Sequence, residues 1–440
     1  MFEQEIAVLA KAIREAVTEY KADNRVPLRR DVRVRRRDLS LKYQEDFAFA
    51  NFNSERTEED SWDWEDQTRF GDSVLSGLQE YKSLLTALKV DSGHADSVDR
   101  FARSVASASF QNASDQEITG HVDALARDLG DLPTRVIVTA FIDGVSISES
   151  PIVVSDFVTL RRPTPEDLAE YVALDEHGGF TFPKGDTWFR VVGDFAFDVM
   201  GTGLAQDRLV RMIEALRLFR VGSVSAPRFS MVLEHSFRQP GGATLFSPGG
   251  RPSHQVYKVS PPDAPILDKF LRDIAPLLPG LFPALILGKV ATEKEIAYLR
   301  YNDALFQNHL PEQVITSAVT ALEALFLTNE SELRYRLAQR VAVFLRFLGT
   351  QTDAGNTYET VSKGYGIRST FVHGGSLKPK ERRRAQELAP VLLEYARASV
   401  LAFFQMAAPK AELLKQLDRA MIDPAGAKGL EESLEPVVHK

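Results

Sequence analysis

The spacing of the apolar residues changes twice along this chain, and that change limits what it can fold into. Near the N-terminus Ile6, Ile13 and Val17 recur on one face of a helix. The run Arg135–Ile142 (RVIVTAFI) is instead rich in β-branched and aromatic residues, and the turn signal Asp143-Gly144 follows it. Helical spacing then returns and continues almost to the C-terminus. A chain that alternates in this way is predicted to be an α+β protein of several domains.

The first two regions differ in this spacing. Residues 1–131 are predicted to be helical, because Val74, Leu78, Tyr81, Leu85 and Leu88 repeat the helical pattern. Residues 132–262 are predicted to form a mixed α+β module. Besides the run at 135–142, it should contain strands at 188–192 and 229–235 and an amphipathic helix at 207–219.

A proline-rich stretch, Pro261 to Pro265, marks the start of the third region. Residues 263–423 are predicted to form an all-helical bundle, with helices at 265–275, 293–308, 311–327, 331–348, 356–373 and 380–407. Pro390 should kink or split the last of these. Residues 424–440 contain Pro, Gly and Glu and are expected to form a disordered tail.

Two blocks of opposite charge lie in the first region. Arg25–Arg37 holds seven arginines, and Glu55–Asp72 holds eight acidic residues together with Trp62 and Trp64. One interpretation is two solvated faces that pair with each other. The other is that the arginine block contacts phosphate.

Composition excludes several kinds of site. The chain has no cysteine, which excludes disulfides, thiolate zinc sites and cysteine nucleophiles. The histidines outside the segment described next show no metal-ligand spacing, so neither a metal nor a cofactor is expected. A net charge of −8 means that nucleic acid would have to bind a local patch. The acidic N-terminus and the lack of a long apolar run predict a cytoplasmic protein that contacts no membrane.

The segment Tyr365–Gly375 (YGIRSTFVHGG) carries the clearest candidate chemistry. Arg368 and His373 lie five positions apart, and Gly374-Gly375 is predicted to end their helix in a left-handed cap. An imidazole transfers protons near neutral pH, and a guanidinium holds phosphate without losing its charge. Five positions on a regular helix turn two side chains about 140° apart. Both can therefore act on one phosphate if the motif bends at the helix end, or if two copies of the helix meet in a dimer.

The surroundings of this segment are basic. Thr328–Arg384 holds eleven Lys and Arg residues against five Asp and Glu, a local net charge of +6 that favours a polyanion. The candidate RNA-binding residues are Arg336, Lys378, Lys380, Arg382, Arg383 and Arg384. Glu323 is the one charge within the apolar run Ala318–Leu327. It should be paired, with Arg340 or Arg368.

Three elements in this order resemble the HEPN superfamily, and most closely its Apea-like branch. They are Ala321–Leu325 (ALEAL), Leu333–Arg340 (LRYRLAQR) and Tyr365–Gly374. The resemblance covers about the last third of the chain. More weakly, residues 132–262 resemble the domain that precedes Apea-like HEPN modules. The resemblance implies a short helical bundle that carries an Arg-x4-His motif, acts as a metal-independent endoribonuclease and forms a homodimer with a composite site.

Carried over by residue, the resemblance implies that Arg368 and His373 are catalytic, with Glu323, Ser369 and Arg340 in support. His373 would act as base or acid while a ribose 2′-hydroxyl attacks the adjacent phosphate, and Arg368 would neutralise the phosphoryl charge. Such an enzyme would serve anti-phage defence or act as a toxin. The first two regions would then sense a trigger or restrain the nuclease, and an antitoxin is a further partner to consider.

A second interpretation keeps the HEPN fold without catalysis. Catalytic members often carry Asn, Asp or His after the motif arginine, where this chain has Ser369. A serine donates a hydrogen bond to phosphate but replaces neither a carboxylate nor a second imidazole. The module would then be an RNA-binding or protein-interaction scaffold. Arg368 and His373 would be ion-pair and helix-terminal residues, and Arg336 and Arg340 would be charges on a helix face.

Overall fold

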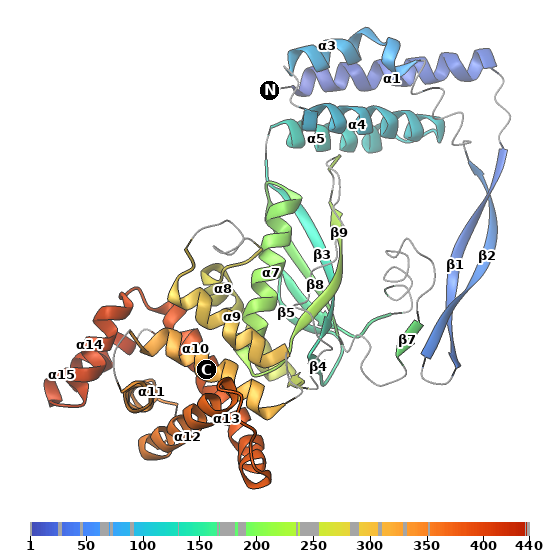
Figure 1. Ribbon diagram of the computed structural model, residues 1–440. Helices are drawn as coiled ribbons and strands as arrows, with labels where there is room; N and C mark the ends of the chain where they lie inside the picture. Colours follow the sequence, from blue (N-terminus) through green and yellow to red (C-terminus); the bar gives the residue numbers. More distant parts are fainter. Residues whose placement is uncertain are drawn as a thin grey trace.

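The computed structural model places the N-terminal helices at one end, an antiparallel sheet in the middle and the C-terminal helices at the other end (Figure 1). This arrangement confirms the predicted α+β class. The structure describes residues 2–24, 29–44, 47–61, 70, 74–88, 92–130, 132–164, 167, 181–183, 191–234, 236–237, 255–281, 290–306, 310–328, 332–350, 353–435 and 437.

The N-terminal helices enclose a hydrophobic core of their own. They are α1 (Glu3–Asn24), α3 (Gln79–Ala87) after the 3-10 turn η1 (Leu75–Gly77), α4 (Ser92–Phe110) and α5 (Asp115–Leu129). Ile6, Ile13 and Val17 are buried there, as their spacing predicts. Asp128 of α5 is also buried and accepts hydrogen bonds from Ser236 Oγ (2.8 Å) and the Phe237 backbone N–H (2.7 Å), which connects these helices to the central region.

The first region is not helical throughout, which corrects the prediction for residues 1–131. It contains a long antiparallel hairpin of β1 (Arg29–Gln44) and β2 (Phe47–Ser61), and β7 (Thr181–Pro183) pairs with β2. Val32 and Val34 alternate with charged residues, as do Leu39 and Leu41 with polar ones. This period of two is typical of a strand. The many arginines in this segment obscured the alternation in the sequence.

The register of the hairpin bears on the two charge blocks. Arg30 lies opposite Asp60, and Arg35 lies opposite Glu55 along the paired backbones. The backbones of the described parts of the two blocks therefore lie on adjacent strands. Trp62 and Trp64 lie outside the described residues.

The central region is built on a five-stranded antiparallel sheet in the order β5-β6-β8-β3-β9. The strands are β3 (Thr134–Asp143), β5 (Ile152–Ser155), β6 (Val158–Arg161), β8 (Val191–Val199) and β9 (Ser225–Leu233), while β4 (Val145–Ile147) pairs in parallel with β10 (Tyr257–Val259). The strand predicted at 188–192 overlaps β8 only at its last two residues; residues 188–190 lie outside the described ones. Gly144 has φ +82°, and a Cβ there would lie 2.5 Å from the Ser223 carbonyl oxygen, so the tight turn after β3 requires glycine.

Helix α7 (Thr202–Phe219) joins the sheet to the C-terminal helices. Most of its apolar residues are buried in one hydrophobic core that continues from the sheet into the C-terminal region. At its C-terminal end the Tyr301 hydroxyl donates to the Arg217 carbonyl (2.8 Å), and Arg397 donates to the Leu218 carbonyl (2.5 Å). Residues 132–262 and 263–423 thus share a core, although their sequence patterns differ.

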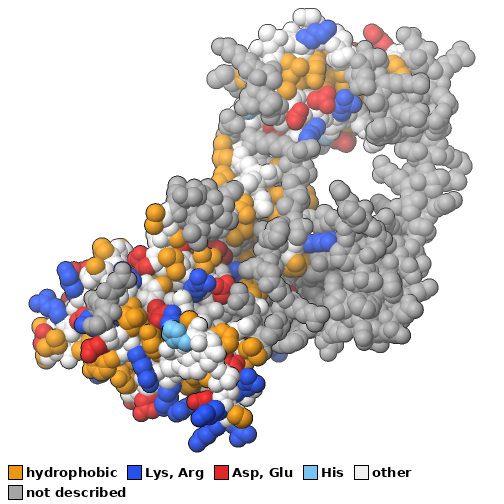
Figure 2. Space-filling model, in the orientation of Figure 1, with side chains coloured by type: hydrophobic (Ala, Val, Ile, Leu, Met, Phe, Trp, Pro, Cys, Tyr) orange, Lys and Arg blue, Asp and Glu red, His pale blue; other side chains and the backbone are white. Residues whose placement is uncertain are grey.

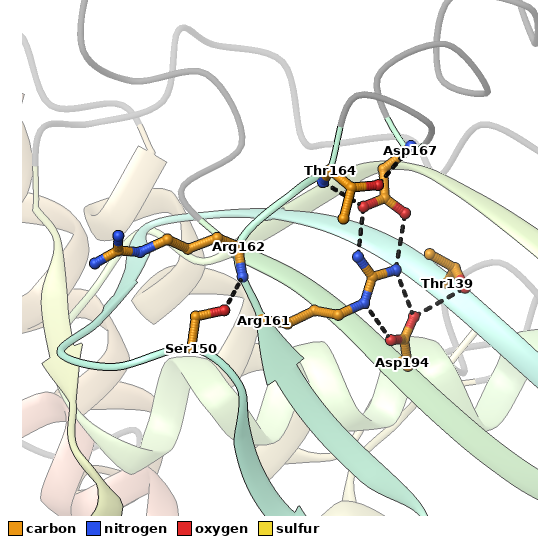
Figure 3. Close-up of polar contacts among 7 residues, drawn as sticks. All are labelled: Thr139, Ser150, Arg161, Arg162, Thr164, Asp167 and Asp194. Atoms are coloured by element: carbon orange, nitrogen blue, oxygen red, sulfur yellow. Dashed lines mark hydrogen bonds and ion pairs between the residues drawn. The ribbon is translucent and has the colours of Figure 1, made fainter. Parts of the chain in front are cut away.

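A second connection within the sheet is made by Arg161 at the end of β6 (Figure 3). Its Nε donates to Asp194 of β8 (2.6 Å), and its two terminal nitrogens form a bidentate pair with Asp167. Asp194 also accepts from Thr139 of β3 (3.0 Å). Burial alone would raise the pKa of Asp167, but hydrogen bonds from Arg161 and Thr164 outweigh it and hold that pKa below its usual value.

The C-terminal region is helical, as predicted. Its elements are η2 (Pro261–Asp263), α8 (Ala264–Ile274), η3 (Ala275–Leu277), α9 (Glu293–Phe306), α10 (Pro311–Phe326), α11 (Leu333–Phe347), α12 (Ala354–Val372), α13 (Pro379–Gln405), α14 (Lys410–Ala420) and α15 (Pro424–Leu434). Each predicted helix has a counterpart with slightly shifted ends. Helix α13 runs through Pro390 as one helix, so the proline does not split it; Ala389, Leu392 and Leu393 around it are buried.

The prediction of a disordered tail at 424–440 is wrong for most of that segment. Asp423 caps α15 by accepting a hydrogen bond from the Gly426 N–H, and Pro424 occupies the first helical position. Leu430 and Leu434 are buried in the shared core. Two leucines four residues apart give this short helix an apolar face, which stabilises it despite its glycines.

Within the described ranges no single helix is both long and apolar enough to cross a bilayer. Helices α13 and α14 meet that criterion only when taken together across their 119° bend.

Candidate active site

The segment predicted to carry the chemistry lies at the end of α12. The helix begins at Asp353, whose side chain accepts from the Asn356 N–H, and it ends where Gly374 adopts φ +76°. The Gly374 N–H bonds to the Phe371 carbonyl (3.1 Å), and the Gly375 N–H bonds to the Thr370 carbonyl (2.8 Å). The predicted glycine cap is therefore confirmed.

Arg368 lies on the side of α12 that faces α10. Its NH2 atom is 3.0 Å from Glu323 Oε2, so of the two partners proposed for Glu323 the structure selects Arg368. Both side chains are only partly exposed, Arg368 at 26% and Glu323 at 15%. Burial raises the pKa of Glu323, and the charge of Arg368 lowers it in part. The carboxylate is thus held in its charged form mainly by one arginine.

The guanidinium of Arg368 is not saturated. Its Nε is buried, yet among the described residues no acceptor lies within hydrogen-bond distance of it. The guanidinium carbon lies 5.7 Å from the centre of the Tyr365 ring, one turn earlier on the helix. A buried N–H without an acceptor is unfavourable, so an anion that reached it after the covering side chains move would be stabilised by this donor.

His373 lies at the C-cap of α12 and is exposed. Its backbone N–H still bonds to the Ser369 carbonyl (3.2 Å), so the backbone stays helical up to His373 and turns only at Gly374. The motif therefore does not bend between Arg368 and His373, and the two side chains point about 140° apart. The arrangement in which the motif bends at the helix end is therefore not the one that the structure shows. Val372, next to His373, is 53% exposed.

A shallow groove of about 640 Å³ runs beside Arg368 between α11 and α12. Three tyrosines line it, Tyr335, Tyr358 and Tyr365, together with Glu332, Leu333, Arg334 and Ser362. Tyr335 and Tyr358 meet edge to face at 6.2 Å, and half of Tyr335 is exposed. Arg334 Nε donates to Ser362 Oγ (2.9 Å). Exposed aromatic rings beside an arginine are the surface on which single-stranded bases stack.

Arg340 does not belong to this site, contrary to the role expected for it. It is buried, donates to both carboxylate oxygens of Asp418 (2.9 and 2.8 Å) and also donates to the Phe326 carbonyl (2.9 Å). Lys410 Nζ reaches the Ala324 and Leu327 carbonyls at the same end of α10. These two cations satisfy the last carbonyls of α10 and hold α14 against it.

The remaining basic residues divide into two groups. Arg382 is bound to Glu312 of α10 (3.1 Å), whose carboxylate is almost fully buried, so Arg382 connects the starts of α13 and α10. Lys378, Lys380, Arg383 and Arg384 are exposed at the start of α13, directly after the His373 cap. Figure 2 shows Lys and Arg side chains gathered at this tip of the C-terminal helices. Arg336 is half-buried on α11, and Ser369 is half-buried beside Arg368.

The sequence predicted the arginine, the histidine, the acid and the cap but not the groove. The sequence predicted no functional role for Tyr335, Tyr358 or Tyr365. The spacing of seven between Tyr358 and Tyr365, with Tyr335 two positions after the start of α11, is the signal that a search for base-stacking residues would use. In the described part of the chain no three His, Cys, Asp or Glu side chains cluster closely enough to hold a metal ion. No protein-family model, curated protein or solved structure matches this chain.

Proposed function

We propose that this protein is a metal-independent endoribonuclease of the HEPN type, an effector of anti-phage defence or a toxin that works in the cytoplasm. One observation carries the proposal. Arg368 is partly exposed, held by a single acid and left with a buried N–H that has no acceptor among the described residues, and an exposed histidine follows on the same helix. The basic tip and the tyrosine groove on either side support RNA as the substrate.

The reaction follows from these groups. His373 takes the proton of a ribose 2′-hydroxyl, whose oxygen attacks the adjacent phosphorus. The bond from phosphorus to the 5′-oxygen breaks, and a histidine returns a proton to that oxygen. Arg368 stabilises the charge that develops on the phosphoryl oxygens. The products are a 2′,3′-cyclic phosphate and a free 5′-hydroxyl, and DNA is not a substrate because it lacks the attacking hydroxyl.

Because Arg368 and His373 diverge on a straight helix, the proposed active unit is a homodimer. The arginine of one protomer and the histidine of the other would face one phosphate between two copies of α12. Bases next to the scissile bond would then stack in the tyrosine groove, which adjoins Arg368 through Tyr365.

A non-catalytic scaffold is the alternative, and two observations favour it. Ser369 stands where catalytic relatives of this type often carry Asn, Asp or His, and Arg368 already has a partner in Glu323. In this alternative the same surface binds RNA or a protein without cleaving anything.

In the decisive experiment, total RNA is incubated in EDTA with the wild-type protein, with the His373→Ala variant and with the His94→Ala variant as a matched control. We expect cleavage by the wild type and the control only, with cyclic phosphate ends. Equal cleavage by all three would show that the activity lies elsewhere. Binding of RNA without cleavage by any of them would favour the scaffold.

The dimer has its own test. Arg368→Ala and His373→Ala proteins, each inactive alone, are mixed, unfolded together and refolded. A composite site should recover part of the activity, since half of the sites in a mixed dimer pair an intact arginine with an intact histidine. If no activity returns although mixed dimers form, the two residues act within one chain.

A further inference from the structure

A second cleft, far from α12 in sequence, lies between α7, α8 and the sheet. It has a volume of about 640 Å³. Its walls are Leu204, Asp207, Arg208, Arg211 and Met212 of α7, Leu271 and Arg272 of α8, Ala275 and Pro276 of η3, Ala196, Phe197 and Asp198 of β8, and Phe157. This size falls within the range of small-molecule sites, and a meeting point of helices and a sheet is a usual place for them.

The floor of the cleft is apolar. Phe197, Met212 and Leu271 are buried beneath it, and Leu204 is 52% exposed at its edge. The apolar surface open to a ligand is therefore mainly that of Leu204, with the edges of Phe197 and Met212.

Two arginines stand over aromatic rings at the rim. Arg208 lies 5.9 Å from the centre of the Phe197 ring, and Arg272 lies 4.5 Å from that of Phe157. Each guanidinium is only partly used by the contacts that the structure describes. Arg208 donates to the Asp198 carbonyl (3.3 Å), and Arg272 donates through Nε to Asp268 (2.9 Å). Stacking on the ring fixes the plane of each guanidinium group, and the N–H groups at the edge of that plane can donate to an anion.

The third arginine of the cleft, Arg211, has a structural role in its wall. Arg211 pairs with Asp207 (2.7 Å) and donates to the carbonyls of Pro276, Leu278 and Pro279. Asp207 also accepts from the Leu281 N–H (2.8 Å), so both charges of this pair are occupied. Arg208 and Arg272 are the remaining cations of the lining. Because Asp198 is exposed beside them and Asp268 pairs with Arg272, an anion would bind at the guanidinium edges that these acids leave open.

We propose that this cleft binds a small anionic molecule with a flat apolar body. The anionic group lies between Arg208 and Arg272, and the body packs on Leu204 and the edges of Phe197 and Met212. This site is independent of the ribonuclease proposal, because no residue of α12 takes part in it.

The test uses two dyes with the same aromatic body, 8-anilinonaphthalene-1-sulfonate and the uncharged N-phenyl-1-naphthylamine. The wild type should bind one sulfonate per chain, at least tenfold more tightly than the uncharged dye. Arg208→Gln with Arg272→Gln should weaken sulfonate binding at least tenfold and leave the uncharged dye unchanged. Arg300→Gln is the matched control. Arg300 is 52% exposed and paired with Asp303, much as Arg272 is 54% exposed and paired with Asp268.

A second variant protects the test against misfolding. Leu204→Trp enlarges an exposed side chain at the edge of the cleft and should reduce binding of both dyes. Adenosine 5′-monophosphate and 2-naphthoate are then used as competitors, and displacement by one or the other assigns a phosphate or a carboxylate as the preferred group. The proposal is overturned if the arginine variants bind the sulfonate as the wild type does, if Leu204→Trp has no effect, or if neither competitor displaces the dye.

Discussion

Arg161 in the sheet and Arg368 on α12 both face carboxylates, but they are bound in different ways. Arg161 uses Nε and both terminal nitrogens on Asp194 and Asp167, and Asp194 is further held by Thr139 (Figure 3). Arg368 makes one ion pair, to Glu323, and its buried Nε has no acceptor among the described residues. The exposed fractions of the two arginines are nearly equal, 24% and 26%, so burial does not account for the difference.

The two acids differ in the same way. The pKa of Asp167 is lowered although burial alone would raise it, because Arg161 and Thr164 outweigh that effect. The pKa of Glu323 is raised, since burial outweighs the charge of Arg368. The donors of Arg161 are used by its two carboxylates, and this site contributes to stability. Arg368 has donor capacity left, so it can bind a further anion. This contrast distinguishes a structural arginine from a candidate for function.

The largest effect is expected for the Arg368→Met variant, and it concerns the rate of RNA cleavage. Loss of the guanidinium should lower the rate by about 100- to 1000-fold, the usual cost of removing a group that stabilises transition-state charge. Stability should fall by only about 1 kcal/mol, because a Glu323 with a raised pKa can take up a proton instead. Cleavage of a labelled RNA and urea unfolding of the same preparation measure the two effects. An active but strongly destabilised variant would make Arg368 a structural residue.

Arg161→Met should show the reverse. It leaves Asp194 and Asp167 without their cation, and breaking such a partly buried pair should cost about 3 kcal/mol. The urea midpoint should fall clearly, while the cleavage rate per folded molecule stays that of the wild type. Equal urea midpoints for Arg161→Met and Arg368→Met would remove the distinction between the two sites.

Glu214 of α7 extends the comparison of Asp167 with Glu323, because it is a buried carboxyl that no arginine among the described residues holds in a bidentate pair. It accepts a hydrogen bond from the Gly280 N–H (2.9 Å), and burial raises its pKa to about 7. Between its ordinary value of 4.5 and about 7, the folded protein holds a proton that the unfolded chain has lost. Stability should therefore fall as the pH rises through this window.

Glu214→Gln removes this titration and keeps an acceptor for Gly280. The variant should be more stable than the wild type at pH 8 by about 3 kcal/mol and nearly equal to it at pH 4.5. Unfolding midpoints at intervals between pH 4.5 and 8 measure the difference. A constant difference at all pH values would show that Glu214 does not titrate in this range.

The sequence predicted features set by residues close together in the chain. The Gly374 cap follows from a glycine after the last helical turn, and the pairing of Glu323 follows from one charge in an apolar run, although the sequence left two arginines as partners. Glu323 pairs with Arg368 because Arg340 is bound to Asp418, 78 positions away in the sequence. No local sequence pattern contains that contact.

The errors have the same origin. The β1–β2 hairpin was missed because arginines and acids mask an alternation of few apolar residues, and its pairing links segments that the periodicity treats separately. Helix α15 was missed because its stability depends on Leu430 and Leu434 entering a distant core. The groove beside Arg368 exists only where α11 and α12 pack together, so its tyrosines carried no sign of a shared surface.

The smallest effects are expected at two glycines near Arg368. A Cβ on Gly366 would meet no atom within 4 Å, and two positions on a helix put it on the opposite side from Arg368. Gly366→Ala should therefore stabilise the protein by about 0.5–1 kcal/mol and leave cleavage unchanged.

Gly364 lies one turn before Arg368, on nearly the same side of α12. A Cβ there would lie 2.5 Å from Leu392 Cδ1 and 3.4 Å from Val319 Cγ2, so the buried Leu392 side chain of α13, or α12 itself, would have to shift. Gly364→Ala should cost about 1 kcal/mol. It should also slow cleavage several-fold, because the displaced helix carries Arg368. Thermal unfolding and RNA cleavage of both variants measure this. If Gly364→Ala loses stability but cleaves as fast as the wild type, catalysis does not depend on how α12 is seated against α13, and the placement of Arg368 by this packing would have to be given up.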